Sequence, residues 1–285
     1  MQLGELISEF RTRLTSVMDA SEADAVTFRA FEDVLGIRRS DTVIRKQDKL
    51  DENTIDSMKR VLQRLEAHEP VQYVTGKAPF MEWTFEVRRD VLIPRPETEE
   101  LVRWMLETIK PASTGNLIDL GTGSGCIPIA FKKNRPTWKV YAIDVSPAAL
   151  EVAARNAQTI GADILLESDD ILLTHSSAPW RMARFDVIIS NPPYIPAEEM
   201  STMHPRVVNY EPSLALFTPP SDPLIFYKSI RDLAIQQLEP NGWIFLEVHE
   251  NFSESTLRLF QSPPFKMAEI KEDIFGKERM IRVRM

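Results

Sequence analysis

Over the first 70 residues, apolar side chains recur at intervals of three and four, which is the spacing of one helix face. The first run ends at Met18. The second follows a Ser21-Glu-Ala-Asp24 capping pattern and stops at Gly36, and the third ends near Pro70. The apolar positions are Leu3, Leu6, Ile7, Phe10, Leu14, Val17, Met18, Phe28, Phe31, Val34, Leu35, Ile55, Met58, Val61, Leu62 and Leu65. We predict a small helical domain over residues 1–70 that holds no catalytic constellation.

A different pattern begins at Val71. Residues 71–76 and 80–87 have the character of two strands with a turn at Gly76. In the second of these, Trp83, Phe85 and Val87 alternate with polar residues, as a half-buried strand requires. We predict a β-hairpin linker over residues 71–90.

The remaining residues, 91–285, show the alternation of an α/β domain. A helix is expected to open at Pro96 or Thr98, and beyond residue 116 short apolar runs alternate with helical patterns. This alternation predicts a doubly wound, mostly parallel sheet with helices on both faces. The predicted strands are 117–120, 140–143, 164–166, 185–190 and 243–248, and the predicted helices between them are 127–133, 148–159 and 224–238. In such sheets ligands bind at the carboxyl ends of the strands.

Composition and charge narrow the possible functions. The chain has 285 residues and a formal net charge of −8, which disfavours binding of nucleic acid through a generally basic surface. Its single cysteine, Cys126, excludes an intrachain disulfide and any zinc site with two cysteine ligands from this chain. No apolar run approaches the roughly 20 residues of a membrane span, and the first ten residues lack the basic start of a secretory signal. We expect a cytoplasmic protein.

A glycine-rich loop follows the first strand of the predicted sheet. Gly121, Gly123 and Gly125 lie between that strand and a helix, and glycines let a ligand approach the backbone closely. Asp144 ends the next strand, where a carboxylate can accept both hydroxyls of a ribose. The pattern therefore predicts a site for an adenosine cofactor. The alternative is a tight strand-to-helix turn beside a solvated aspartate.

Two adjacent acids, Asp169 and Asp170, follow the third strand. Asp169 is placed to bond an adenine amino group. The alternative is a solvated turn, which is common for adjacent acids.

The segment Asn191-Pro-Pro-Tyr194 comes directly after a buried strand. Pro192 and Pro193 have no backbone N–H, so their backbone offers only carbonyl acceptors. The Asn191 side-chain oxygen adds another acceptor, and Tyr194 supplies a flat wall. Two acceptors at a strand end suit a planar NH2 group, and the prolines hold them in place before a substrate arrives. The alternative is an ordinary turn, since Asn and Pro are common turn residues.

With these motifs, the chain resembles the class I S-adenosylmethionine-dependent methyltransferases that act on amino or amide nitrogens. It is most similar to the PrmC/HemK family, which methylates the glutamine of the Gly-Gly-Gln motif in class 1 peptide-chain release factors. The matching segments are Glu69-Pro-Val-Gln-Tyr-Val-Thr-Gly76, Leu92-Ile-Pro-Arg-Pro-Glu-Thr-Glu99, Asp119-Leu-Gly-Thr-Gly-Ser-Gly125, Asn191-Pro-Pro-Tyr-Ile195 and Glu211-Pro-Ser-Leu-Ala-Leu216.

The resemblance implies a role for each motif. The loop of Gly121, Thr122, Gly123, Ser124 and Gly125 would line the methionine part of the cofactor. Asp144 would hold the ribose, and Asp169 or Asp170 would lie by the adenine. Asn191 would touch both cofactor and substrate, and it would hold the glutamine amide together with Pro192, Pro193 and Tyr194. The fold would be a seven-stranded sheet whose last strand, near residues 280–284, is antiparallel, and residues 1–70 would help to dock the release factor.

Two segments depart from the family pattern, Glu247-Val-His-Glu-Asn251 and Thr218-Pro-Pro-Ser-Asp-Pro223. Two other functions stay open on the residues alone, a DNA adenine-N6 methyltransferase and a non-enzymatic S-adenosylmethionine-binding adaptor. No metal site or general base is indicated, because His68, His175, His204 and His249 are scattered along the chain.

Overall fold

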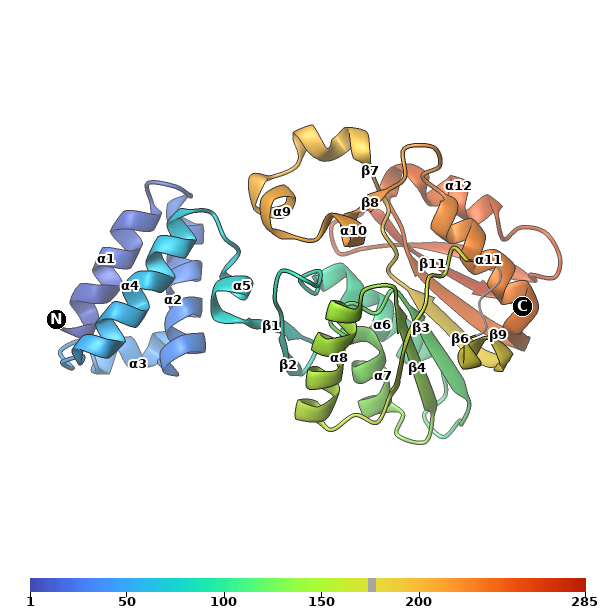
Figure 1. The fold of residues 1–285 in the computed structure, drawn as a ribbon, viewed down its shortest axis with the longest axis horizontal. Helices are drawn as coiled ribbons and strands as arrows, with labels where there is room; N and C mark the ends of the chain where they lie inside the picture. Colours follow the sequence, from blue (N-terminus) through green and yellow to red (C-terminus); the bar gives the residue numbers. More distant parts are fainter. Residues whose placement is uncertain (174–177) are drawn as a thin grey trace. The chain divides into compact units, whose positions relative to one another are not determined.

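The computed structural model describes residues 1–173 and 178–285. The chain folds into two compact units (Figure 1). Unit 1 comprises residues 1–77 together with residues 204–210, and unit 2 comprises residues 78–203 and 211–285. A short segment from the middle of the chain therefore folds with the N-terminal helices. None of the helices in the described residues is long and apolar enough to cross a membrane.

Unit 1 is a small helical bundle. Its helices are α1 (Leu3–Leu14), α2 (Ala20–Leu35), α3 (Arg39–Ile44), α4 (Glu52–Glu66), α5 (Val71–Thr75) and α9 (Pro205–Tyr210). The periodic apolar residues pack into one core, in which Phe10 and Phe31 meet edge to face at 5.0 Å. Gly36 ends α2 with a positive φ, as predicted. The N-cap is Asp19 rather than Ser21, because the Asp19 carboxylate accepts the N–H groups of Ser21 and Glu22.

A hairpin follows unit 1, over different residues from those predicted. Residues 71–75 form helix α5 instead of a strand, and the hairpin consists of β1 (Lys77–Phe80) and β2 (Trp83–Glu86), with its turn at residues 81–82. Pro70 suits the start of a helix, and Gly76 with φ +74° ends it. Its buried residues, Tyr73 and Val74, are neighbours in sequence, whereas a half-buried strand would turn neighbouring residues to opposite faces. The predicted alternation of β2 is confirmed.

In the described residues of unit 2, seven strands form the central sheet, in the order β10-β11-β9-β6-β3-β4-β5. Neighbours among β9, β6, β3, β4 and β5 are parallel, and β11 is antiparallel to both β10 and β9. The strands are β3 (Asn116–Leu120), β4 (Lys139–Asp144), β5 (Leu165–Ser168), β6 (Phe185–Ser190), β9 (Leu238–Glu247), β10 (Met267–Glu272) and β11 (Glu278–Arg284). The predicted doubly wound sheet with an antiparallel last strand is confirmed.

Helices cover both faces of this sheet (Figure 1). The first face packs against α6 (Pro96–Thr108), α7 (Cys126–Asn134) and α8 (Pro147–Ile160), and the second against α11 (Ile225–Gln237) and α12 (Ser253–Arg258). Pro96 is the first residue of α6. Consecutive residues of β3 face opposite cores, Leu117 one way and Ile118 the other, as a strand buried on both faces requires. The remaining short elements are η1 (Pro179–Met182), β7 (Ile195–Pro196), η2 (Ala197–Thr202), α10 (Ser213–Leu216), β8 (Phe217–Thr218) and η3 (Glu250–Phe252).

Asn156 on α8 ties the hairpin to the glycine loop. Its side-chain oxygen accepts the N–H of Glu86 at 2.7 Å, and its nitrogen donates to the carbonyls of Glu86 and Ser124 at 3.0 and 2.9 Å. Because Asn156 is buried, these bonds hold strand β2 and the glycine loop against the same helix.

Candidate active site

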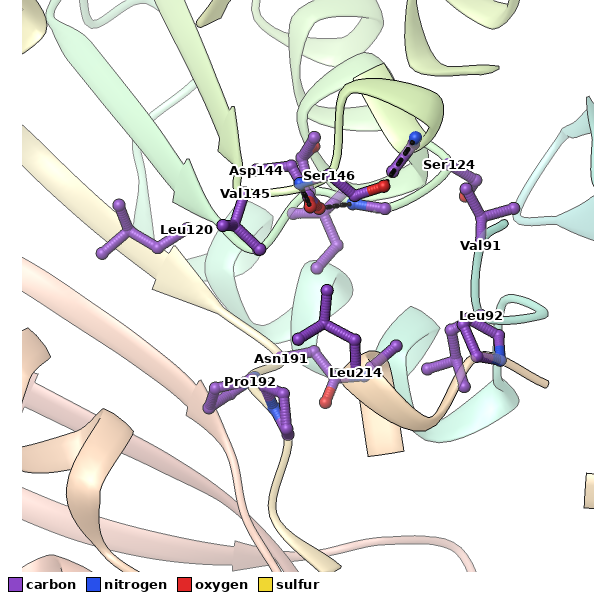
Figure 2. A pocket seen from close by; sticks show the side chains of 18 of the residues that line it. Val91, Leu92, Leu120, Ser124, Asp144, Val145, Ser146, Asn191, Pro192 and Leu214 are labelled. Carbon is purple, nitrogen blue, oxygen red and sulfur yellow. Dashed lines mark hydrogen bonds between the residues drawn. The ribbon is translucent and has the colours of Figure 1, made fainter. Parts of the chain in front are cut away.

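A cavity of about 350 Å³ lies in unit 2 at the carboxyl ends of the parallel strands. Figure 2 shows Asp144 and Ser146 on one side of it and Asn191, Pro192 and Leu214 on the other, with Val91 and Leu92 along a third side. The predicted site residues that line it are Gly121, Thr122, Gly123, Ser124, Asp144, Asp169, Asp170, Asn191, Pro192 and Pro193. Gly125 and Tyr194 are absent from the described residues that line it.

The glycine loop leaves room for a ligand. Gly121 and Gly123 have φ values of +80° and +53°, and no heavy atom lies within 4 Å of the place where a Cβ would stand. A side chain at either residue would be strained and would project into open space beside the loop. At Gly125 the constraint is steric, because a Cβ there would lie 3.1 Å from side-chain atoms of both Ala153 and Ile129. Glycine at this position allows α7 and α8 to pack closely.

Asp144 stands at the end of β4 and faces the glycine loop. Its Oδ2 accepts the N–H of Gly123 at 2.8 Å, and its Oδ1 accepts the N–H of Ser146 at 2.9 Å. Burial raises the pKa of Asp144, while these backbone N–H groups act in the opposite direction. Each oxygen has a second lone pair, so the carboxylate can accept further hydroxyl donors.

Asp169 is held by the protein itself. Its Oδ2 accepts hydrogen bonds from Nε1–H of Trp180 at 2.9 Å and from Nε–H of Arg181 at 2.8 Å. Its Oδ1 accepts a hydrogen bond from the backbone N–H of Asp170. The Asp170 side chain accepts the N–H of Leu172 at 2.9 Å. These bonds shape the loop after β5, and both aspartates line the cavity.

Asn191 is connected to a chain of side-chain hydrogen bonds. Its Nδ2 donates to Oγ1 of Thr98 at 3.0 Å, and the Thr98 hydroxyl donates to Oε2 of Glu247 at 2.6 Å. The Tyr194 hydroxyl donates to Oε1 of the same carboxylate at 3.0 Å. Sequence reasoning missed Thr98 and Glu247 as site residues, although both lie in segments compared with the PrmC/HemK pattern.

Glu247 is only 1% exposed at the end of β9. Burial raises its pKa to about 7, and the hydroxyls of Thr98 and Tyr194 act in the opposite direction. Burial and the neighbouring Glu247 both raise the pKa of Tyr194, which keeps that hydroxyl protonated as a donor. The site thus contains a buried carboxylate whose two oxygens each accept a hydroxyl.

Both parts of the chain match known families. The family described as "PrmC N-terminal domain" matches residues 5–76, and "Methyltransferase small domain" matches residues 99–208. The release factor glutamine methyltransferase of Flavobacterium psychrophilum is 39% identical, over 98% of this chain and 99% of its own length. That of Streptococcus pneumoniae is 35% identical, over 99% of this chain and 98% of its own. The chain belongs to the release factor glutamine methyltransferase family.

Solved structures agree with this fold. A methyltransferase from Pyrococcus furiosus has a TM-score of 0.51 at 15% identity, covering 82% of this chain and 98% of its own. The 16S rRNA N2 G1207 methyltransferase RsmC of Thermus thermophilus, solved with AdoMet and guanosine, has a TM-score of 0.52 at 15% identity, covering 73% of this chain and 49% of its own. Release factor glutamine methyltransferases use S-adenosylmethionine, and the glycine loop and Asp144 fit a ligand of that kind.

Arg95 and Glu211 join two motifs at the rim of the cavity. The buried Glu211 carboxylate accepts hydrogen bonds from Nη2 of Arg95 and from the backbone N–H of Ile93. The Ile93–Glu99 block is thereby fixed to the Glu211–Leu216 block, and Arg95, Pro212 and Leu214 line the cavity.

His249 and Cys126, also singled out in the sequence, have structural surroundings. His249 lies 3.3 Å from Oε2 of Glu199, while its Nδ1 accepts the N–H of Asn251. Burial raises the pKa of the Cys126 thiol to about 12, so it stays protonated. His175 lies outside the described residues. Within residues 1–173 and 178–285, no three His, Cys, Asp or Glu side chains are grouped as metal ligands would be.

Asp119, two residues before Gly121, is a second buried acid that sequence reasoning missed. It is fully buried, and neither carboxylate oxygen has a hydrogen-bond partner of normal geometry among the described residues. Burial raises its pKa to about 7, Asp144 acts in the same direction, and the Thr122 hydroxyl acts in the opposite direction. The site therefore holds a carboxylate that is unfavourable to ionise.

This gives a prediction for stability against pH. The raised pKa means that the folded state binds more protons than the unfolded state between pH 3.8 and about 7. Wild type therefore loses stability through that window as the pH rises, and Asp119→Asn avoids this loss. The difference in unfolding free energy, variant minus wild type, should rise with pH and level off above about 7.

The measurement is urea unfolding of the ligand-free protein at several pH values between about 4 and about 8. Asp163→Asn is the matched control, because it removes a carboxylate at an exposed position of the same unit. A difference that does not vary with pH would contradict the assignment of a raised pKa to Asp119.

Proposed function

We propose that Asn191 and Pro192 hold the substrate glutamine amide at the edge of the cavity, beside a cofactor that the glycine loop and Asp144 bind. The chain methylates the side-chain amide nitrogen of the glutamine in the Gly-Gly-Gln motif of class 1 release factors. The observation that supports the clamp is the position of Asn191 and Pro192 on the cavity wall, opposite Asp144 (Figure 2).

S-adenosylmethionine supplies an electrophilic methyl group on a sulfonium that leaves as a neutral thioether. In this proposal Asp144 accepts the ribose hydroxyls, and Asp169 and Asp170 lie by the adenine. The loop of Gly121, Thr122, Gly123, Ser124 and Gly125 runs along the methionine part, with Gly125 acting through the packing of α7. Val145, which is apolar and partly exposed in the cavity, offers a contact surface for the base.

An amide nitrogen is a poor nucleophile because its lone pair is delocalised into the carbonyl. The protein must therefore orient the nitrogen and favour the charge that develops on it. The Asn191 Oδ1 and the Pro192 carbonyl accept the two N–H bonds, so the lone pair points toward the methyl group. Pro193 stiffens the loop. Tyr194 is not among the described residues that line the cavity, so we assign its contribution to the support of this loop.

The first test concerns the cofactor. Asp144→Ala should weaken S-adenosylmethionine binding about ten-fold or more, because hydrogen bonds to a charged group are worth about 1.5–3 kcal/mol each. Isothermal titration calorimetry measures this, with Asp163→Ala as the control at an exposed aspartate. Wild-type affinity in Asp144→Ala would remove Asp144 from the cofactor site.

The second test concerns the clamp. Asn191→Ala should lower the rate of methyl transfer about 10²-fold or more, as when one preorganised hydrogen-bonding group is deleted from an active site. The rate is measured in a single turnover at saturating cofactor and release factor, so that losses in binding do not contribute. Asn191→Asp keeps an acceptor but adds charge near the sulfonium, and we expect it to bind cofactor yet react slowly. A wild-type rate in Asn191→Ala would rule out the amide clamp.

Unit 1 is proposed to dock the release factor. It matches the PrmC N-terminal domain, its periodic apolar residues form a core, and its described residues hold no group of three His, Cys, Asp or Glu side chains that could ligate a metal. Helix α3 buries none of its residues, and Val43 and Ile44 on it are 80% and 87% exposed. Exposed apolar side chains at adjacent positions are suited to contact with a protein partner.

The variant Val43→Ser with Ile44→Ser should raise KM for the intact release factor about five-fold or more, since exposed apolar contacts of this kind bind a partner. Its kcat/KM on a short peptide containing Gly-Gly-Gln should stay unchanged, because the substitutions are exposed and lie in unit 1. Steady-state kinetics on both substrates makes the comparison. An unchanged KM for the intact factor would exclude this face of α3 from docking.

We place this activity in the cytoplasm, without direct contact to nucleic acid. The support is the net charge of −8 and the protein nature of the substrate. Labelled methyl transfer to release factor and not to duplex DNA is the expected outcome of a side-by-side assay.

A further inference from the structure

The hydrogen bonds that reach Asn191 have a defined direction. In its ionised form Glu247 has only acceptors, so the single hydroxyl proton of Thr98 is then donated to it across the 2.6 Å contact. The Thr98 oxygen can then only accept, and the group 3.0 Å from it on Asn191 must be the NH2 end of the amide. Asn191 is thereby left with its Oδ1 and one N–H for other partners.

An asparagine side chain without such a partner can turn its amide by 180°, which exchanges acceptor and donor. In the proposed clamp that exchange would set an NH2 group of Asn191 against the NH2 group of the substrate. Two donors facing each other cannot bond, so the amide orientation decides whether Asn191 can hold glutamine.

We propose that Thr98 and Glu247 are positioning residues, which hold the NH2 end of Asn191 so that its Oδ1 faces the substrate amide. The inference rests on the proposed clamp. Both residues are nearly fully buried, and they come from two elements far apart in sequence, the first turn of α6 and the end of β9. The bond from Thr98 therefore fixes Asn191 relative to the sheet and not only within its own loop.

The same carboxylate also holds Tyr194. Its Oε1 accepts the Tyr194 hydroxyl at 3.0 Å, and the Tyr227 hydroxyl donates to the backbone carbonyl of Glu247 at the same distance. Glu247 therefore anchors the loop at both ends of the Asn191–Tyr194 motif. In this proposal the Glu247 side chain positions the Asn191–Tyr194 loop. Glu247 is also the first residue of a segment that departs from the family pattern.

The test compares Thr98→Val, which has nearly the same shape but no hydroxyl, with Thr98→Ser, which keeps the hydroxyl. Thr27→Val is the matched control, because the buried Thr27 hydroxyl donates to the carbonyl of Ala23 in unit 1. Single-turnover methyl transfer is measured at saturating cofactor and release factor, and cofactor affinity is measured by calorimetry. We expect a rate loss of about ten-fold or more in Thr98→Val, and rates within about two-fold of wild type in Thr98→Ser and Thr27→Val.

A double-mutant cycle separates positioning from general damage to the fold. If Thr98 acts through Asn191, Thr98→Val should cause less than about a two-fold further loss of rate when Asn191 is already Ala. Losses that simply multiply would overturn the inference. A wild-type rate in Thr98→Val, with a slow rate in Asn191→Ala, would also overturn the inference about Thr98. It would not contradict the proposed amide clamp. A wild-type rate in Asn191→Ala would instead reject the clamp.

Glu247→Gln provides an independent variant of nearly the same shape. The Gln side chain has one oxygen and one NH2 group, so it can accept from only one of the two hydroxyls that bond Glu247. We expect transfer slower by about ten-fold or more, as for loss of one buried hydrogen bond to a charged group, with cofactor affinity within about two-fold of wild type. A wild-type transfer rate in Glu247→Gln would show that the carboxylate does not set the orientation of Asn191.

Discussion

The site depends on one buried carboxylate, that of Glu247. It lies at the end of β9 and accepts hydroxyls from the first turn of α6 and from the loop after β6. Burying a carboxylate is unfavourable unless it is hydrogen-bonded, and removing one partner leaves the remaining charge exposed to the apolar interior. The three segments are therefore held in one arrangement, because each contributes to satisfying the same group. The orientation of Asn191 follows from that arrangement.

Acidic groups with raised pKa values recur along the carboxyl edge of the sheet. Asp119, Asp144 and Glu247 stand at or near the ends of β3, β4 and β9, and burial raises the pKa of each. Ionising these groups is unfavourable, since their charged forms are poorly solvated. A cofactor with a positively charged sulfonium and ammonium would offset part of that cost, because an opposite charge nearby favours the ionised carboxylate. The electrostatics of the site thus match the cofactor that the family uses.

The two units are connected at more than one point of the chain. The segment that follows Asn191–Tyr194 runs through β7 and η2, contributes α9 to unit 1, and returns to unit 2 at Glu211. Within unit 1, Tyr210 donates to the carbonyl of Ala67, and Arg206 pairs with Glu22. Glu211 then bonds Arg95 and the N–H of Ile93. The loop that is proposed to hold the substrate amide is thereby covalently continuous with the unit that is proposed to dock the substrate protein.

The sequence by itself determined the parts of this protein that depend on local patterns. Apolar periodicity located three helices of unit 1, α1, α2 and α4, and five strands of the sheet, β3, β4, β5, β6 and β9, since period and burial are read directly from consecutive residues. The glycine loop, Asp144 and Asn191 could be predicted to lie near one another, because strand-end positions in a parallel sheet meet at one edge, and they line one cavity. Only the tertiary structure decided that residues 71–75 are helical, because a short segment with apolar residues fits a strand or a helix. The flanking Pro70 and Gly76 are compatible with both. The tertiary structure also brings together Thr98 and Glu247, which lie 149 positions apart in the chain. Their bond exists only because α6 packs against β9, and no local pattern records such a contact.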